Sequence, residues 1–223
     1  MQRLNKIASD DYDNIECWQI VEAFNKGQVG WCRRQLHGLN IVREGDEQST
    51  SRIDDLQILL LDLPLIMTNK KLYFEAPIPP DYFRWKRVSA YATDKCCDTP
   101  RRMKIFQVEE GNIDDILRDV NKRPSFEWAE TISTLKNNKV LIYTDEKFSI
   151  SSSTLVYYRQ PRRIEIQGCS NPYTNQISPV DIEAEFKDDI VEVMIDEAAM
   201  VLAGDIESMN QKAREEQAVE QNN

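Results

Sequence analysis

Two short patterns place residue types that can do chemistry at the spacing of catalytic motifs. Ser133 and Lys136 form the first, an S-x-x-K pattern in which a lysine can activate a serine nucleophile. The S-D-N and K-T-G patterns that accompany it in penicillin-binding enzymes are absent from the chain. We therefore interpret Ser133 and Lys136 as exposed polar residues of a helix or a turn.

The second pattern, Asp181, Glu185 and Lys187, resembles the D…E-x-K ligand set of metal-dependent nucleases. Such a site needs carboxylates that converge on a divalent metal from different strands. Here all three residues lie within seven positions at a predicted helix start, where the helix dipole favours acidic side chains. A nuclease that uses these residues is the least favoured alternative.

His37 and five cysteines are the other chemically interesting residues. No nucleophile can be matched to His37, the only histidine, and we interpret it as a cation at a helix C-terminus. The cysteines form no C-x-x-C pair, so no zinc site is predicted; they are Cys17, Cys32, Cys96, Cys97 and Cys169. We expect reduced thiols, mostly buried, in a reducing compartment. The sequence thus predicts no catalytic residue, no cofactor, no metal and no enzyme.

Basic residues cluster in three stretches, 84–87, 101–104 and 157–163, and aromatic residues accompany them in the first and the third. Such interleaving can bind single-stranded nucleic acid. The alternative, which we favour, is that surface arginines bind the carboxylates of a protein partner. The candidate charged interface consists of Arg84, Lys86, Arg87, Arg159, Arg162 and Arg163.

Charge is distributed unevenly along the 223 residues. From Asp181 onward, thirteen acidic residues outnumber three basic ones, which accounts for the whole net charge of -10. The preceding 180 residues hold 25 acidic and 25 basic residues. An acidic chain is not a free-standing DNA-wrapping protein, because phosphate binding relies on positive charge. The acidic end indicates either a basic partner surface or simple solvation.

Helical periodicity is present at both ends of the chain. We expect a helix around 15–24, a break at Gly27 and Gly30, further helical turns to about residue 39, and a helix from Ser51 that stops before Pro64. A C-terminal helix is expected from about 185 to 210. Its stretch 190–203 is apolar on nearly every side and needs more than one face covered. Its candidate oligomer or partner interface consists of Phe186, Ile190, Val193, Met194, Val201 and Leu202.

The middle of the chain predicts β-structure with one short helix at 112–120. Strands are expected at 72–74, 83–91, 102–108, 140–143, 154–158 and 164–166. A short helix is the alternative for 83–91. No alternation of strands and helices indicates a doubly wound fold. The predicted fold class is α+β: a helical bundle, formed by the N-terminal helices and the long C-terminal helix, with an antiparallel β-meander inserted between them.

Four regions follow from this interpretation. They are an N-terminal helical region at 1–68, a mainly β region at 69–178, a C-terminal helix at 179–210 that packs on the helical region, and a flexible acidic tail at 211–223. No secretory segment is recognised at the N-terminus. The apolar stretch 58–67 contains Asp62 and Pro64 and is shorter than a membrane span. We expect a protein that folds in a cytosol and binds no membrane.

Three stretches, in this order, resemble neck proteins of tailed phages. The first is 76–83, with a P-x-D-Y-like element; the second runs from 121–128 through 140–145 to 156–164; the third covers 185–190, 195–199 and 202–207. The order is similar to that of structural ring proteins in crAss-like phages. The resemblance covers roughly residues 70 to 210, and its specificity comes from the order of the motifs.

The resemblance implies a structural virion protein. It would be a subunit of a homo-oligomeric ring of twelve-fold symmetry. This ring would connect portal to tail and line the channel through which DNA passes without sequence recognition. Its partners would be the portal protein and other neck or tail rings, and its locations the virion and, during assembly, the host cytoplasm. Two alternatives stay open: an adaptor that binds a basic protein partner, and a tail-tube or portal-accessory protein.

Overall fold

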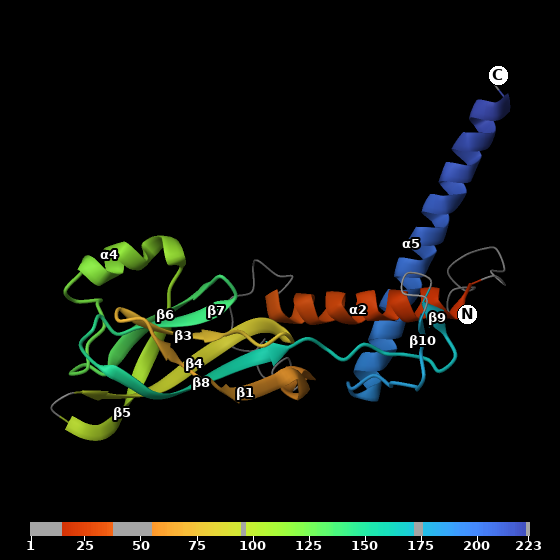
Figure 1. Ribbon diagram of the computed structural model, residues 1–223. Coiled ribbons are helices and arrows are strands. Elements are labelled where there is room, and N and C mark those ends of the chain that lie inside the picture. The colour runs from red at the N-terminus through yellow and green to blue at the C-terminus, as the bar shows by residue number, and fades with distance from the viewer. Residues whose placement is uncertain (1–14, 38–54, 95–96, 172–175, 222–223) are drawn as a thin grey trace. The chain divides into compact units, whose positions relative to one another are not determined.

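The computed structural model describes residues 15–37, 55–94, 97–171 and 176–221 (Figure 1). The chain forms two compact units. One consists of Leu59–Gln160, and the other combines the chain up to Ile58 with Pro161–Asn223. The predicted helical bundle with an inserted meander is wrong. Most of the structure is an eight-stranded, curled, mixed sheet, and three helices are present among the described residues.

The unit 59–160 contains the whole eight-stranded sheet. In chain order its strands are β1 (Leu60–Pro64), β2 (Thr68–Asn69), β3 (Tyr73–Pro77), β4 (Tyr82–Asp94), β5 (Cys97–Gln107), β6 (Glu130–Lys136), β7 (Lys139–Tyr143) and β8 (Ser149–Arg159). The spatial order is β1-β8-β4-β5-β6-β7-β3-β2. The helix α4 (Ile113–Arg118) lies between β5 and β6 in the chain.

The sheet is not a meander, because β5 and β6 run parallel while all other neighbours are antiparallel. Parallel neighbours need a long crossover rather than a tight turn, and residues 108–129, which contain α4, supply it. β5 also changes partner along its length. Its first part, up to Met103, pairs with β4, and its last part, from Lys104, pairs with β6.

β1 occupies residues for which the sequence predicts a helix. The leucine spacing before Pro64 fits a helical face, yet Leu60–Pro64 pairs along its length with β8. A short apolar run cannot be assigned to helix or strand by periodicity alone, and pairing with β8 decides this one. Pro64 is compatible with the result because β1 is at the sheet edge, where a missing N–H removes no interior ladder bond.

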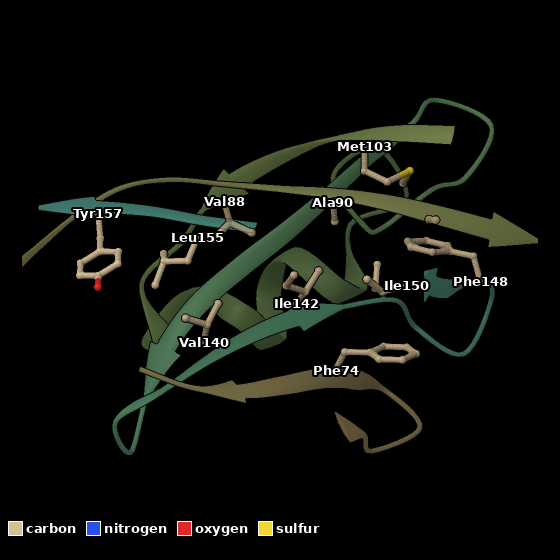
Figure 2. Packing of buried hydrophobic residues seen from close by; sticks show 11 residues of the cluster. Phe74, Val88, Ala90, Met103, Val140, Ile142, Phe148, Ile150, Leu155 and Tyr157 are labelled. Carbon is tan, nitrogen blue, oxygen red and sulfur yellow. The ribbon is translucent and has the colours of Figure 1, made fainter. Parts of the chain in front are cut away.

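The main core lies inside the curl of the sheet (Figure 2). Val88, Ala90 and Leu155 from β4 and β8 pack in the same cluster as Val140 and Ile142 from β7. Leu155, Val140 and Ile142 are fully buried. Burial of each such side chain stabilises the fold by about 1.5–3 kcal/mol. Along β4, β7 and β8, the residues that face this core are mostly every second one, which is the side-chain period of a strand.

A second cluster covers the opposite face of β6 and β7. Ile132, Leu141 and Tyr143 alternate with the residues of the main core and pack with Ile113 of α4. Ile116, one turn further along α4, is partly buried against the same cluster. The short helix predicted around 112–120 is thus confirmed, and it covers one part of the sheet.

The other unit consists of two helices and a short hairpin. They are α2 (Cys17–His37), α5 (Asp188–Gln221), β9 (Ser170–Asn171) and β10 (Gln176–Ile177). The expected break at Gly27 and Gly30 is wrong, since α2 is continuous through both. The strand expected at 164–166 does not close the sheet; Glu165 instead forms an isolated bridge with Ile182 within this unit.

α2 packs against the N-terminal half of α5. A Cβ atom added at Gly27 would lie 3.3 Å from the backbone nitrogen of Ala198, so the helices approach closely there. Arg34 forms an ion pair with Glu197, and the rings of Trp31 and Phe186 meet edge to face at 5.5 Å. The helix α5 continues to Gln221, into the region for which the sequence predicts a flexible tail. None of the described helices has the length and apolar character that a membrane span requires.

The close approach at Gly27 can be tested against Gly30, which lies in the same helix. We expect Gly27→Leu to lower the free energy of unfolding by about 1–3 kcal/mol, because overpacking would force α5 away. A Cβ at Gly30 would meet only the flexible end of Arg34, at 3.6 Å. Gly30→Ala should therefore stabilise by about 0.5–1 kcal/mol through helix propensity. Urea denaturation followed by far-ultraviolet circular dichroism measures both; a neutral Gly27→Leu would contradict the helix contact.

Candidate interaction surfaces

The S-x-x-K residues do not form a catalytic pair. Ser133 and Lys136 are three positions apart on β6, so their side chains project from opposite faces of the sheet. Ser133 is fully buried, not exposed as predicted, and it lies in a strand rather than a helix or turn. Lys136 forms an ion pair with Glu110, and that hydrogen bond raises the pKa of the lysine. No proton can pass directly between the two side chains.

The nuclease-like residues are used to hold the fold. An Asp181 carboxylate oxygen accepts a hydrogen bond from the backbone N–H of Gln167 at 2.7 Å, and Glu185 accepts one from the N–H of Arg162 at 2.8 Å. Lys187 forms an ion pair with Asp55 at 3.8 Å. Within the described ranges, no three cysteine, histidine or acidic side chains converge on a point where a metal could bind.

The predicted apolar interface on α5 separates into three environments. Phe186, Ile190 and Met194 are buried within the chain's own packing. Val201 and Leu202 are half-buried. Val193 is 47% exposed, on the side of the helix that α2 does not cover. Of the six residues, Val193 is therefore the one that presents a large part of its surface to a partner.

Sequence reasoning missed Met200, which is 59% exposed. It lies seven positions after Val193, so both fall on one side of α5. The acidic side chains of Asp189, Glu192 and Asp196 are exposed beside them. The spacing of seven could have indicated a common face, but only the position of α2 shows that this face is exposed. We call these five residues the α5 stripe.

The predicted basic residues fall into both units. Arg84, Lys86 and Arg87 lie on β4, and Arg159 lies on the neighbouring strand β8, where it is opposite Tyr82. Arg84 and Arg159 are half-buried, whereas Lys86 and Arg87 are exposed. Lys86 lies over the ring of Tyr158 at 6.0 Å. Arg162 and Arg163 are exposed in the helical unit instead.

Arg87 shares its face of the sheet with exposed residues of β4 and β5 that the predicted interface did not include. Tyr91 is directly opposite Arg102, and the next pair in the register, Ala90 and Met103, is buried in the core, so Tyr91 and Arg102 point outward. Lys104 and Phe106 follow on the same face of β5, with the Lys104 ammonium 4.6 Å from the Phe106 ring centroid. Tyr91 is 46% exposed and Phe106 43%. We call Arg87, Tyr91, Arg102, Lys104 and Phe106 the β4–β5 face.

Two buried amides of α2 hold the chain where it enters the helical unit. Asn25 donates to the carbonyl of Ile164 at 3.2 Å and accepts from its N–H at 2.9 Å, while Gln28 donates to the carbonyl of Arg162 at 2.8 Å. Beside this contact lies an open groove of about 310 Å³, lined by parts of α2 and by residues 163–165, 169 and 176–179. Polar and apolar residues both line this groove, and among them no nucleophile is paired with a base.

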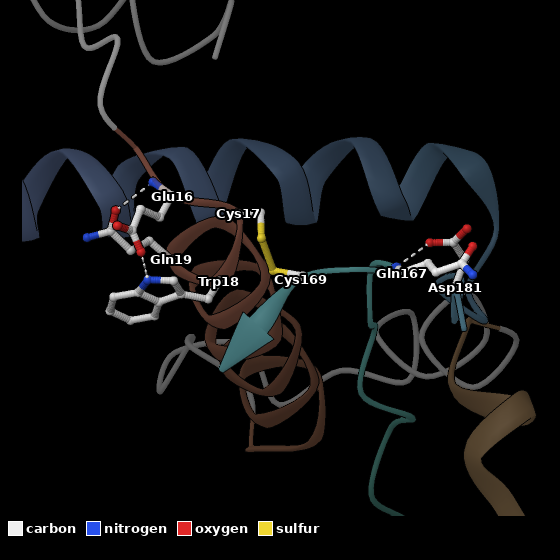
Figure 3. The surroundings of a disulfide bond; sticks show 7 residues. All are labelled: Glu16, Cys17, Trp18, Gln19, Gln167, Cys169 and Asp181. Atoms are coloured by element: carbon white, nitrogen blue, oxygen red, sulfur yellow. Dashed lines mark hydrogen bonds between the residues drawn. A yellow bond between two sulfur atoms is a disulfide. The ribbon is translucent and has the colours of Figure 1, made fainter. Parts of the chain in front are cut away.

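A disulfide joins Cys17, at the start of α2, to Cys169, just before β9 (Figure 3). The Cα atoms are 5.9 Å apart. The prediction that all cysteines are reduced is thus wrong for this pair, which sequence spacing could not reveal because 152 positions separate the two. Cys32 is a free, buried thiol, and burial followed by the charge of Glu185 raises its pKa to about 12. Such a thiol is unreactive at neutral pH.

Two buried tyrosines of the sheet unit have strongly raised pKa values. Burial, together with a hydrogen bond to Asp81 at 2.9 Å, raises the pKa of Tyr157 to about 12. Burial and the charge of Glu110 raise that of Tyr143 to about 12 as well. Both hydroxyls are therefore neutral over the physiological range, and neither is activated for proton transfer.

No protein-family model matches the chain, and no curated protein matches it either. The side chains described above stabilise the fold and form two exposed surfaces: the basic and aromatic β4–β5 face, and the acidic and apolar α5 stripe.

The disulfide gives a direct stability prediction. Cys17→Ser should lower the free energy of unfolding by about 2–5 kcal/mol, because the bridge closes a very long loop and restricts the unfolded chain. Reductant should destabilise the wild-type protein to a similar extent and leave the variant unchanged. A non-reducing digest should yield one peptide pair linked through Cys17 and Cys169. Full alkylation of Cys17 in the unreduced folded protein would contradict the bridge.

The raised pKa of Tyr157 predicts a loss of stability at alkaline pH. The pKa of the Tyr157 hydroxyl is about 10 in the unfolded chain and about 12 in the folded protein. The stabilisation is complete below pH 10 and is lost as the pH rises from 10 to 12, by about 1.4 kcal/mol per pH unit.

Tyr157→Phe should remove this part of the slope in denaturation series across that range. At neutral pH it should cost about 1 kcal/mol for the lost hydrogen bond to Asp81. The exposed Tyr91→Phe serves as control. Equal slopes in the wild-type protein and Tyr157→Phe would show that Tyr157 is not responsible.

Proposed function

We propose that this chain is a non-enzymatic structural subunit of the neck of a tailed phage virion, in a ring that connects portal to tail and surrounds the DNA channel. The observation that carries the proposal is the exposed stripe of α5. A helix whose one side packs on α2 while Val193 and Met200 stay exposed is suited to a further protein contact.

The order of motifs along residues 70–210 supports the same proposal. The motifs that resemble crAss-like phage ring proteins fall on β3 and β4, on β7 and β8, and on α5. In these elements, residues of the motifs stabilise the fold through packing and hydrogen bonds. Tyr157, for example, is buried and bonds to Asp81. A protein whose distinctive residues serve packing rather than chemistry fits a structural role.

The disulfide bears on where the protein works. Disulfides persist in oxidising surroundings, which include virion surfaces, and are rare in proteins that stay in a reducing cytosol. A subunit that assembles in the host cytoplasm and is then carried by a released virion is exposed first to a reducing and later to an oxidising environment. On this proposal the bridge between Cys17 and Cys169 forms after the subunit has left the reducing cytoplasm.

The second candidate function is that of an adaptor that binds a basic protein partner. It is favoured by α5, whose 34 residues contain ten acidic and two basic side chains. An adaptor of this type would bind a basic protein as a monomer, and its affinity would fall steeply with salt. A ring subunit would instead self-associate, alone or on the portal.

Light scattering of the purified protein, with and without portal protein, tests the proposal. We expect a closed oligomer under at least one of these conditions. Val193→Asp should abolish it while leaving the circular dichroism spectrum intact, because a charge would be desolvated at the interface. Ile190→Asp is unsuitable, since Ile190 is buried within the chain.

Val120→Asp is the matched control, because Val120 is 69% exposed in the turn after α4, away from α5, and receives the same change. A monomer under both conditions would overturn the ring, and salt-sensitive binding to a basic partner would then support the adaptor.

A further inference from the structure

We propose that the β4–β5 face of one subunit binds the α5 stripe of a second copy of the same chain. This inference rests on the proposed ring and goes further by naming the two surfaces that meet. The two surfaces are different parts of the chain, so their contact is heterologous. Heterologous contacts that close by rotation produce rings.

Opposite charge is the first argument. The β4–β5 face presents Arg87, Arg102 and Lys104, all exposed. Among the described residues, no ion pair engages Arg87 or Arg102, and Lys104 has only a surface pair with Glu130 at 3.7 Å. Such a surface pair contributes little and is easily exchanged. The face is thus a cationic surface available to external carboxylates.

The α5 stripe supplies those carboxylates. Asp189, Glu192 and Asp196 recur at spacings of three and four, so they form a row along one side of the helix. A helix of this kind, laid on the sheet face, would place a row of acids over a row of bases.

Matching apolar centres are the second argument. Tyr91 and Phe106 are 46% and 43% exposed within the basic surface, and Val193 and Met200 are 47% and 59% exposed within the acidic one. Aromatic rings against aliphatic and thioether side chains make favourable contacts. Each surface therefore has an apolar centre with charged neighbours, the arrangement of a specific protein interface rather than of a solvated face.

Nucleic acid is the competing occupant of a basic, aromatic face. Stacking and phosphate contacts could in principle use Tyr91 and Phe106 with Arg102 and Lys104. Two observations favour the helix of a second copy. The whole chain carries a charge of -10, which repels a polyanion, and Val193 and Met200 on α5 are exposed enough to contact Tyr91 and Phe106.

Two charge-reversal variants of the full chain test the pairing. Arg102→Glu/Lys104→Glu leaves Arg87 as the one basic residue of the β4–β5 face, so both surfaces are then predominantly acidic. Glu192→Lys/Asp196→Lys leaves Asp189 as the one acidic residue of the α5 stripe, so both surfaces are then predominantly basic. Each variant alone should self-associate at least about tenfold more weakly than the wild-type protein, by sedimentation velocity across a range of concentrations at low salt. An equimolar mixture should recover assemblies in which the two variants alternate.

Lys122→Glu/Arg123→Glu is the control for net charge, because both residues are exposed after α4 and outside the β4–β5 face. It should self-associate like the wild-type protein. If Glu192→Lys/Asp196→Lys fails to fold, shown by its circular dichroism, Met200→Glu replaces it as the probe of the stripe and should also weaken association at least tenfold.

The outcomes separate this inference from the ring itself. A ring that persists in both charge-reversal variants would overturn the pairing while leaving the proposed function intact. A monomer at all concentrations, with and without portal protein, would overturn both. Binding of a fluorescent single-stranded oligonucleotide that is lost in Arg102→Glu/Lys104→Glu, with self-association unchanged, would assign the face to nucleic acid instead.

Discussion

The helical unit depends on how the backbone that follows β8 satisfies its hydrogen bonds. From Arg162 onward that backbone has no ladder partner until Glu165, and an unpaired buried N–H or C=O would cost stability comparable to a lost hydrogen bond. The side chains of Asn25, Gln28 and Glu185 take the place of a neighbouring strand. Asn25 both donates to and accepts from Ile164, as a paired strand residue would.

This requirement explains the polar residues inside α2. Asn25 and Gln28 are buried on a helix that otherwise buries apolar side chains, and they would be unfavourable there without partners. The disulfide between Cys17 and Cys169 reinforces the same junction at the start of the helix. The N-terminal and C-terminal parts of the chain thus form one unit, although the whole sheet unit separates them in sequence.

In the sheet unit the corresponding constraint is the change of partner along β5. Because β5 pairs first with β4 and then with β6, it connects the strands that supply Val88 and Leu155 with those that supply Val140 and Ile142. The sheet can therefore curl around a single core. The same strand directs Arg102, Lys104 and Phe106 outward, since its alternate residues face the core. Core packing and the exposed surface are two consequences of one register.

The sequence by itself determined the strands and helices whose pattern is strong. The β-rich centre, the short helix near residue 113, the long C-terminal helix and the concentration of acids in it follow from local periodicity and composition, which act over a few residues. It did not show where the residues of the two catalytic patterns lie: Ser133 and Lys136 project from opposite faces of a strand, and Asp181 and Glu185 accept hydrogen bonds from backbone N–H groups.

Only the tertiary structure decided what depends on residues distant in sequence. Leu60–Pro64 forms a strand because it pairs with β8. Cys17 forms a disulfide with Cys169, which lies 152 positions away in sequence. Phe186, Ile190 and Met194 were covered by packing within the chain, which left Val193 and Met200 exposed. Periodicity shows which residues share a face of a helix or strand. It does not show which face the rest of the chain covers, because that depends on long-range packing.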